Sequence, residues 1–305
     1  MRTYFLRAGF LDGAQGFALA VSNAEGTYYR YLKLWLLIQK RGRCQKKFLI
    51  SVVLATYNWP QALQLCLKGL ASQTDTNFEV VIADDGSRED TSQLIKAYLQ
   101  SSHMKISHVW QPDLGFRKAM VLNKAIAASQ GEYLVFLDGD CLVQPDFIDK
   151  HRKFSQHGVI VTGSRILLGE ALTRQLCERE HWSYKEFFVN AWRYRLRGEL
   201  NKLFPLMLKL PDNAVRMYKK FEWRRIKGCN MAAWREDVLN IQGFDEELQG
   251  WGHEDTDFVF RLQRSGIKRK SGAWATEVLH LWHPSASKEN AAKNAEIVRA
   301  KILAK

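Results

Sequence analysis

The 305-residue chain has few cysteines and no long apolar run. Its five cysteines are scattered, odd in number and free of any C-x-x-C pair, which argues against a disulfide framework or a zinc site and fits a reducing compartment. No stretch approaches the roughly 18 consecutive apolar residues of a membrane span. The N-terminal region lacks a signal peptide, because its apolar run LWLLI is too short and begins only at Leu34. We therefore expect a cytoplasmic protein.

Two signatures of phosphate binding are missing as well. The chain contains neither G-x-G-x-x-G nor G-x-x-x-x-G-K-[ST], so the usual dinucleotide and P-loop cradles are absent. A phosphate-bearing ligand would instead need a metal ion and basic side chains to balance its charge.

Positive charge is plentiful and unevenly distributed. The formal net charge is +13, a surplus that favours polyanionic partners. Residues 193–227 alone carry eleven Lys or Arg against three acids. The same segment holds apolar residues spaced roughly as one helical face, namely Leu196, Leu200, Leu203, Phe204, Met207 and Leu208. Two interpretations stay open: a surface that lies on an anionic membrane, or a well-solvated helical pair that covers the core.

From Phe48 onward, strand patterns and helix patterns alternate. Apolar, β-branched runs predict strands over 48–56, 78–84, 105–110 and 132–138. Amphipathic segments, two of them opened by Pro60 and Ser87, predict helices over 60–73, 87–100 and 116–129. This rhythm predicts an α/β fold with a doubly wound, mostly parallel sheet flanked by helices.

Polar residues follow the predicted strands. In such sheets the ligand lies beyond the carboxyl ends of the strands, where the strand order switches. The residues there are Thr56, Tyr57, Asn58, Asp84, Asp85, Arg117, Lys118, Asp138 and Asp140. A single acid means little, because turns favour Asp and Gly, but several acids at one edge predict a site. Asp138 and Asp140 could hold a divalent cation, with Arg117 and Lys118 supplying positive charge.

The ordered motifs carry a family resemblance. SVVLATYN, VVIADDGSRED, LGFRKAMVLNKAI and YLVFLDGD resemble the nucleotide-binding half of family 2 glycosyltransferases with the GT-A fold. The stretch KGCNMAAWREDVLNIQGFDEELQGWGHEDTDF resembles the acceptor half that is shared with galactosyltransferases and chondroitin-polymerase-like enzymes. Together these motifs cover roughly residues 48–285.

For the donor, the resemblance implies a nucleotide site and a metal site. The residues expected beside the nucleotide-sugar are Thr56, Tyr57, Asn58, Asp84, Asp85, Arg117, Asp138, Gly228 and Asn230. The implied ligands of Mn²⁺ or Mg²⁺ are Asp138, Asp140 and the late histidine His280, with His283 as its rival. Such a cation would stabilise the charge on the departing diphosphate.

For the acceptor, the resemblance implies a second acidic cluster, Trp251-Gly252-His253-Glu254-Asp255. Asp255 is expected to be the general base that takes the proton of the attacking hydroxyl. Glu254 is expected to bind acceptor hydroxyls, and Trp251 to offer a flat surface to a sugar. The alternative is a helix start with acids near its positive end. We expect Asp257 to be structural.

The chain divides into five segments on this interpretation. These are an aromatic and basic membrane-surface segment (1–47), a nucleotide-sugar-binding half (48–165), a helical basic insertion (166–226), an acceptor-binding and catalytic half (227–285) and a helical tail (286–305). The first segment resembles the C-terminal tail of lipopolysaccharide-core glucosyltransferases, although it stands at the front of this chain.

The predicted function is a metal-dependent, inverting glycosyltransferase. It would move a sugar from a nucleotide-sugar, in first place a UDP-sugar, to a saccharide or lipid-linked saccharide of a bacterial surface glycan such as lipopolysaccharide core. The expected location is peripheral, on the inner face of an anionic cell membrane.

Three other functional classes fit the sequence less well. A sugar nucleotidyltransferase would need a Gly/Lys-rich phosphate loop, which VVLATYNWPQ does not provide. A basic nucleic-acid-binding protein is disfavoured because its recognition motifs are absent and two acidic clusters would repel phosphate. The intact Asp138, Asp140 and Asp255 argue against an inactive scaffold.

Overall fold

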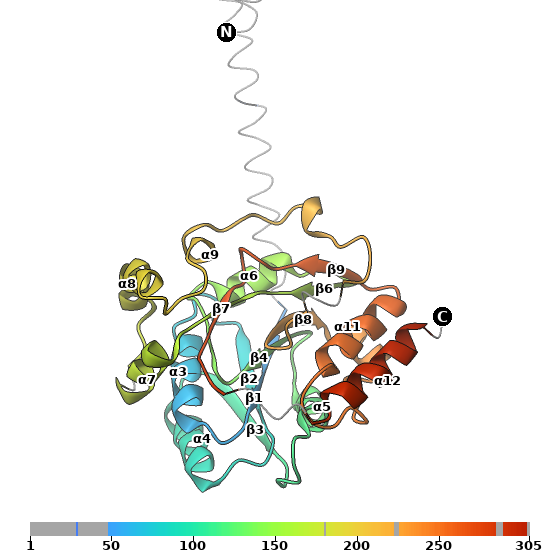
Figure 1. Ribbon diagram of the computed structural model, residues 1–305, viewed down its shortest axis with the longest axis horizontal. Helices are drawn as coiled ribbons and strands as arrows, with labels where there is room; N and C mark the ends of the chain where they lie inside the picture. Colours follow the sequence, from blue (N-terminus) through green and yellow to red (C-terminus); the bar gives the residue numbers. More distant parts are fainter. Residues whose placement is uncertain (1–28, 30–47, 180, 223–225, 285–288, 304–305) are drawn as a thin grey trace, which may run out of the picture. The chain divides into compact units, whose positions relative to one another are not determined.

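A seven-stranded sheet forms the centre of the structure, a computed structural model (Figure 1). From one edge to the other its strands are β3 (Lys105–Trp110), β2 (Phe78–Asp84), β1 (Ile50–Thr56), β4 (Tyr133–Asp138), β8 (Asn230–Trp234), β6 (Val159–Thr162) and β9 (Lys268–Ser271). The first four run parallel, β8 is antiparallel to both of its neighbours, and β6 pairs with β9 in parallel. The predicted α/β fold with a mostly parallel sheet is confirmed.

The structure describes residues 29, 48–179, 181–222, 226–284 and 289–303. Apart from Tyr29, the predicted N-terminal segment 1–47 lies outside the described residues. Residues 48–305 form one compact unit.

Helices cover both faces of the sheet (Figure 1). α3 (Pro60–Ala71) and α4 (Glu89–Ser101) lie on one face, and α5 (Lys118–Ala128), α10 (Arg235–Asn240) and α11 (Glu254–Arg264) lie on the other. Side chains alternate between the two cores as strand geometry requires. Val52 and Val80 pack under α3 and α4, whereas Val53 and Val81 pack in the opposite core. This double burial explains why the parallel strands are continuous apolar runs.

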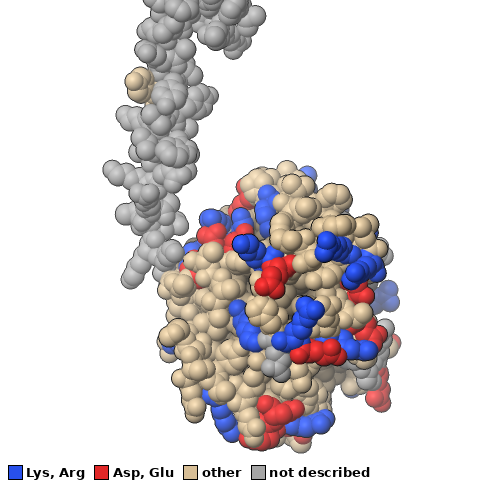
Figure 2. All heavy atoms as spheres, turned by 90° about the vertical axis from the view of Figure 1, so that its left-hand side faces the viewer, with Lys and Arg blue, Asp and Glu red and all other residues tan. Residues whose placement is uncertain are grey.

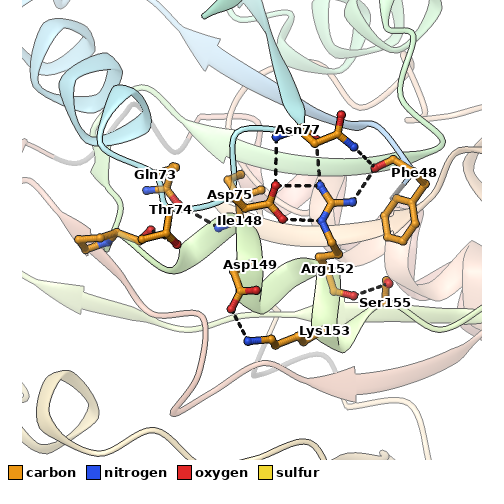
Figure 3. A network of polar contacts seen from close by, with 11 residues as sticks. Phe48, Gln73, Thr74, Asp75, Asn77, Ile148, Asp149, Arg152, Lys153 and Ser155 are labelled. Carbon is orange, nitrogen blue, oxygen red and sulfur yellow. Dashed lines mark hydrogen bonds and ion pairs between the residues drawn. The ribbon is translucent and has the colours of Figure 1, made fainter. Parts of the chain in front are cut away.

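A buried ion pair fixes the amino ends of two central strands (Figure 3). Arg152 of α6 (Phe147–Phe154) pairs with Asp75 at 2.6 Å, Nε to Oδ2. Its guanidinium also donates to the carbonyl oxygens of Phe48, two residues before β1, and Asn77, directly before β2. Removing one partner of such a buried pair typically costs about 3–5 kcal/mol. The ion pair of Arg152 with Asp75 therefore stabilises the amino ends of the strands, opposite to the carboxyl ends where a ligand is expected.

Several predicted elements differ in detail. The helix expected to begin at Ser87 is α4, which begins at Glu89 with Arg88 as N-cap. Ser87 instead accepts a hydrogen bond from the backbone N–H of Asn58 and donates its own N–H to Asp84. The late strand β10 (Val278–His280) is short, because a turn occupies the preceding residues and Trp274 has a φ of 62°.

The single helical face expected across Leu196–Leu208 is wrong. The insertion contains α7 (Glu170–Arg179), α8 (Tyr184–Leu196), the four-residue α9 (Phe204–Met207) and the 3₁₀ turn η2 (Ala214–Arg216). α8 ends at Leu196, and Gly198 has a φ of 76°, which breaks the helical path. Leu200 is buried while Leu196 is exposed, so the apolar residues of this stretch do not share one face. None of the described helices is long and apolar enough to cross a membrane.

Candidate active site

A cavity of about 960 Å³ opens at the carboxyl ends of β1 and β4. Thr56, Tyr57 and Asn58 line it from the end of β1, and Asp138, Gly139 and Asp140 line it from the end of β4. The strand order switches here, because β1 pairs with β2 on one side and with the later strand β4 on the other. The cavity thus lies where doubly wound sheets place their ligands. The start of α11 and the end of β10 contribute its other walls.

Asp85 fixes the loop that follows β3. Its Oδ1 accepts a hydrogen bond from Gln111 Nε2 at 2.6 Å, and its Oδ2 accepts one from the backbone N–H of Arg117 at 2.8 Å. Burial raises the pKa of Asp85, and these two hydrogen bonds partly oppose the rise. The next residue must be glycine, because Gly86 has a φ of 92° and a Cβ there would lie 2.6 Å from Asp113 Cα.

Lys118 and Asp138 form an ion pair inside the cavity. Lys118 is the first residue of α5, and its Nζ lies 2.6 Å from Asp138 Oδ1. Burial alone would lower the pKa of this lysine, but the charges of Asp138 and Glu254 raise it well above its usual value. A fixed cation therefore stands between the acids that follow β4 and those that begin α11.

Asp140, His280 and His283 form a cluster that could hold a metal ion. Each offers one ligand atom, and these atoms lie within 4.8 Å of one another. A small sheet of β5 (Cys141–Leu142), β10 and β7 (Arg165–Leu167) brings these residues together. In it, His280 pairs with Cys141, the residue that follows Asp140. Asp140 Oδ2 is 3.2 Å from His283 Nε2 and 3.6 Å from His280 Nε2. Although burial would raise the pKa of Asp140, the hydrogen bond from His283 and the two imidazoles hold it below its usual value.

The imidazoles of the cluster are oriented for metal binding. Nδ1 of His280 lies 2.8 Å from the carbonyl oxygen of Leu281, and Nδ1 of His283 lies 2.8 Å from that of Pro284. A carbonyl oxygen only accepts, so Nδ1 carries a proton in each ring. Nε2 of His283 donates to Asp140 when that ring is protonated, and loss of the Nε2 proton would leave a lone pair for a metal ion. Metal-binding histidines commonly have this second hydrogen bond. One carboxylate with two imidazoles suits Mn²⁺ better than Mg²⁺, which prefers oxygen ligands.

Glu254 and Asp255 begin α11 and face the same cavity. The chain turns sharply before them, at Gly252 (φ 110°) and His253 (φ 73°). Asp255 Oδ2 accepts a hydrogen bond from the backbone N–H of Gly228 at 2.9 Å, which orients the carboxylate. A Cβ at Gly228 would lie 3.1 Å from that of Asp255, so the two segments meet closely. The positive end of a helix also favours anionic side chains at these positions.

The pKa of Glu254 lies well above the usual value of a glutamate. Burial, followed by the nearby charge of Asp255, raises the pKa of Glu254 to about 7, and the ammonium of Lys118 partly offsets this. Its Oε2 is buried and has no hydrogen-bond partner among the described residues. A buried carboxylate oxygen of this kind needs a donor, and a hydroxyl group of a bound saccharide would provide one.

The C-terminal helix α12 (Ala291–Leu303) braces the start of α11. Asn294 donates from Nδ2 to the carbonyl oxygens of Gln249 and Gly252, on either side of Trp251. Lys301 pairs with Asp245 and with Asp257, at 3.1 Å from the latter's Oδ1. Asp257 is fully buried in these contacts and is paired with Arg261, so it has a structural position as expected.

Three predicted donor residues do not line the cavity. Asp84 is fully buried, with its oxygens taken by the N–H of Ser87 and by His108 Nε2. Asn230 is fully buried too, and its amide donates to carbonyl oxygens within the protein. Arg117 directs its guanidinium to the carbonyl oxygen of Pro112, 2.7 Å away. Among the predicted metal ligands, Asp138 contacts Lys118 and lies outside the cluster of Asp140 with the two histidines.

The remaining predicted residues come together in the cavity. They are Thr56, Tyr57, Asn58, Asp85, Asp138, Asp140, Gly228, Trp251, Glu254, Asp255, His280 and His283. Three cavity cations were not among the predicted contacts. Lys118 was noted only as a source of charge, Arg165 lies in no motif, and Lys227 begins the KGCNM stretch but was given no role. Trp282 also lines the cavity. Its position directly before His283 could have predicted this.

Comparison with known proteins gives the site a family context. The sequence profile described as glycosyl transferase family 2 matches residues 51–222, and the one described as N-terminal domain of galactosyltransferase matches residues 213–283.

Two curated relatives cover most of the described region. The validoxylamine A glucosyltransferase of Streptomyces hygroscopicus subsp. jinggangensis is 28% identical over 242 residues, which cover 76% of this chain and 56% of that protein. The chondroitin synthase of Escherichia coli is 26% identical over 236 residues, which cover 73% of this chain and 33% of that protein. The chain thus spans about half the length of the first relative and about a third of the second.

Solved structures show the same fold at low identity. The mannosyltransferase PcManGT from Pyrobaculum calidifontis, in complex with GDP-Man and Mn²⁺, has a TM-score of 0.52 and 16% identity, covering 93% of this chain and 72% of that one. Residues 1–349 of S. aureus TarS, in complex with UDP-GlcNAc, give a TM-score of 0.52 and 14% identity, covering 84% and 66%. At this identity the likeness shows the GT-A fold alone.

Proposed function

Since the chain belongs to glycosyl transferase family 2, we propose that it is a metal-dependent, inverting enzyme that transfers a sugar from a UDP-sugar to a saccharide hydroxyl. One observation supports this most: a single cavity holds both the cluster of Asp140, His280 and His283 and the carboxylates of Glu254 and Asp255. Two structures with the same fold contain a nucleotide-sugar, one UDP-GlcNAc and the other GDP-Man with Mn²⁺. A donor site and an acceptor site in one cavity are what direct transfer requires.

We place the nucleotide against the ends of β1 and β2. Thr56, Tyr57, Asn58 and Asp85 line this part of the cavity and would contact the base and the ribose. Asp138 would reach the ribose side. Lys118, together with Arg165 and Lys227, brings positive charge toward the place where a diphosphate would lie.

The metal ligands in this proposal are Asp140 and the imidazoles of His280 and His283. A bound Mn²⁺ or Mg²⁺ would stabilise the negative charge on the diphosphate as it leaves. The donor set favours Mn²⁺, because two nitrogen ligands suit it better than Mg²⁺. The protein supplies the orientation, since each imidazole is fixed through its Nδ1 hydrogen bond.

Asp255 is the proposed general base. Its Oδ2 is held by Gly228, and the carboxylate would take the proton of the acceptor hydroxyl as the oxygen attacks C1 of the donor sugar. The new C1–O bond forms as the bond from C1 to the diphosphate oxygen breaks, and UDP leaves with that electron pair. Attack and departure on opposite faces invert the configuration at C1. Glu254 and the half-exposed Trp251 would bind hydroxyls and a sugar face of the acceptor.

The proposed acceptor is a bacterial surface glycan, such as a lipid-linked saccharide of the lipopolysaccharide core. The net charge of +13 supports a partner that carries negative charge, and we also propose peripheral association with an anionic membrane. The resemblance of the N-terminal segment to lipopolysaccharide-core enzymes points the same way.

A donor-release experiment tests this function. The full chain is incubated with a panel of UDP-sugars, with MnCl₂ or with EDTA, and with or without saccharide acceptors, while released UDP is measured. We expect release that requires Mn²⁺, increases with the correct acceptor and is lost in Asp140→Asn. Proton NMR of the product should show the anomeric configuration opposite to that of the donor. Release that EDTA leaves unchanged, or a product with the donor's configuration, would contradict the proposal.

A further inference from the structure

Helix α8 is apolar on two opposite sides. Phe187 and Ala191 are buried against the core, as the inner face of a surface helix should be. The outer side carries a second apolar row, the α8 stripe, formed by Phe188, Val189, Trp192 and Leu196. Their exposed fractions are 38%, 63%, 51% and 78%. The spacing of these residues by three or four positions places them on one side of the helix.

Basic side chains surround the α8 stripe. The exposed cations are Lys185, Arg193, Arg195 and Arg197, whereas Glu186 is the only acid within α8. The guanidinium of Arg193 lies 5.4 Å from the ring centroid of Trp192, so charge and aromatic surface are adjacent. Figure 2 shows the side of the molecule on which α7 and α8 lie, with Lys and Arg scattered among uncharged side chains. Exposed aromatic and aliphatic groups framed by cations match the interface of an anionic bilayer.

We propose that the α8 stripe is a docking surface for a membrane that contains anionic lipid. Trp192, Leu196 and Val189 would enter the boundary between headgroups and acyl chains, while the arginines stay at the headgroups. A second copy of the chain fits this surface less well. A two-fold contact through the same stripe would bring like-charged arginine sets together, whereas anionic headgroups complement them.

The connection after α8 leads directly into the wall of the cavity. Leu200, four residues beyond Leu196, forms a β-bridge with Leu168, which lines the cavity. Glu199 strengthens this junction, because its carbonyl accepts from Gly169 N–H at 2.9 Å and its carboxylate accepts from Leu172 N–H at 3.0 Å. Docking through α8 would therefore hold the cavity wall close to the bilayer, where a lipid-linked acceptor is anchored. This consequence rests on the proposed sugar transfer, whereas the membrane binding of the α8 stripe does not.

Vesicle flotation of the full chain tests the docking surface. The vesicles are pure phosphatidylcholine or phosphatidylcholine with phosphatidylglycerol, and no nucleotide, metal or acceptor is added. The informative variant is Trp192→Glu combined with Leu196→Glu. Its matched control is Leu99→Glu, which places a charge at an exposed helical leucine of α4. Circular dichroism verifies that each variant is folded, so the test is separate from the catalytic proposal.

We expect the unmodified chain and Leu99→Glu to float with the anionic vesicles and to bind them far better than the neutral ones. The affinity of the double variant for anionic vesicles should fall by about tenfold or more, because the variant loses an aromatic and an aliphatic anchor and gains two negative charges. Arg193→Gln with Arg197→Gln should weaken the preference for anionic vesicles and its sensitivity to salt. Equal flotation of the double variant, or no preference for anionic lipid in the unmodified chain, would overturn the proposal. So would a dimer that the double variant dissociates while vesicle binding stays unchanged.

Discussion

The two sides of the cavity are built in different ways. The side where we propose that the donor binds, called the donor side, consists of the ends of neighbouring parallel strands, β1, β2 and β4, whose register the central sheet fixes. The side proposed for the acceptor, called the acceptor side, consists of a helix start that is held by contacts from distant parts of the chain. Gly228 holds Asp255, the carbonyl of Phe116 accepts from Gly250 N–H, and Asn294 holds Gly252. The donor side is therefore a product of the sheet, whereas the acceptor side depends on long-range tethers.

This difference predicts separable effects of mutation. Changes on the acceptor side should impair transfer without weakening the binding of UDP. Changes among the acids and cations at the strand ends should weaken UDP binding first. A substitution on one side of the cavity should therefore leave the function of the other side intact.

The largest effect is expected for Asp255→Asn. Removal of a general base typically lowers kcat by about 10²–10⁴-fold, and the amide keeps the size of the side chain. Calorimetry should show an affinity for UDP within about twofold of the unmodified protein, since Asp255 contacts Gly228 and not the strand ends. Asp90→Asn changes an exposed acid in the first turn of α4, outside the cavity lining, and should leave kcat nearly unchanged. A mere twofold loss of kcat in Asp255→Asn would exclude Asp255 as the base.

On the donor side, Lys118→Met should weaken the binding of UDP. The variant loses the ammonium 2.6 Å from Asp138 Oδ1 and leaves several carboxylates without their counter-charge. We expect about a tenfold or greater loss of UDP affinity in calorimetry with Mn²⁺, because the cavity becomes more negative toward a diphosphate. Lys124→Met, on the same helix and exposed, is the matched control. Equal affinity in both variants would show that Lys118 has no part in donor binding.

Glu254→Gln should change how stability depends on pH. The pKa of Glu254 is raised to about 7, so between its unfolded value and pH 7 the folded state binds more protons than the unfolded state. Stability from this group is therefore present at low pH and is lost as pH rises through about 7. Glu254→Gln lacks this loss and should be about 1–3 kcal/mol more stable than the unmodified protein at pH 8.

Urea unfolding at pH 5 and at pH 8 measures this effect. The advantage of Glu254→Gln should shrink as the pH approaches 5, where Glu254 is already protonated in the folded protein. Glu296→Gln, an exposed position on α12, should show neither the gain nor its pH dependence. An advantage of the same size at both pH values would mean that the carboxylate is not the cause.

The smallest effect is expected for Asn294→Ala. This variant removes two hydrogen bonds to the loop around Trp251 and should cost about 1–2 kcal/mol in the free energy of unfolding. Because the loop is loosened, KM for the acceptor should rise several-fold while the affinity for UDP stays constant. Ala292→Ser, at an exposed position of the same helix, serves as the control. A parallel loss of UDP affinity in Asn294→Ala would contradict the separation of the two sides.

Several residues of the donor side were predicted to lie at the cavity because their sequence signals are local. Buried strands are apolar runs, and parallel strands place the residues after them at one edge, so Thr56, Asp85, Asp138 and Asp140 were expected there. Asp84, Arg117 and Asn230 are the exceptions, and Asp84 shows the reason most clearly. It shares the strand-end motif, but as the last residue of β2 it points to His108 and Ser87 and not into the cavity. A one-residue shift at a strand end changes which way a side chain points.

On the acceptor side the predicted residues line the cavity, but the distant contacts that hold them in place were not predicted. The motif around Glu254 and Asp255 marked the acids, but nothing in the sequence linked Asn294 or Lys301 to them. The basic insertion was similar. Its periodicity indicated one helical face, but Gly198 ends the helical path and Leu200 turns inward to pair with Leu168. Local periodicity does not record such pairings.

The most direct test is calorimetric titration of UDP into the unmodified protein, Asp140→Asn and Asp255→Asn, each with Mn²⁺ and with EDTA. The account predicts Mn²⁺-dependent binding in the unmodified protein, loss of that binding in Asp140→Asn, and its retention in Asp255→Asn. Absence of UDP binding by the folded, unmodified protein in either condition would contradict the donor site. Equal binding by all three proteins would contradict the assignment of Asp140 to the metal.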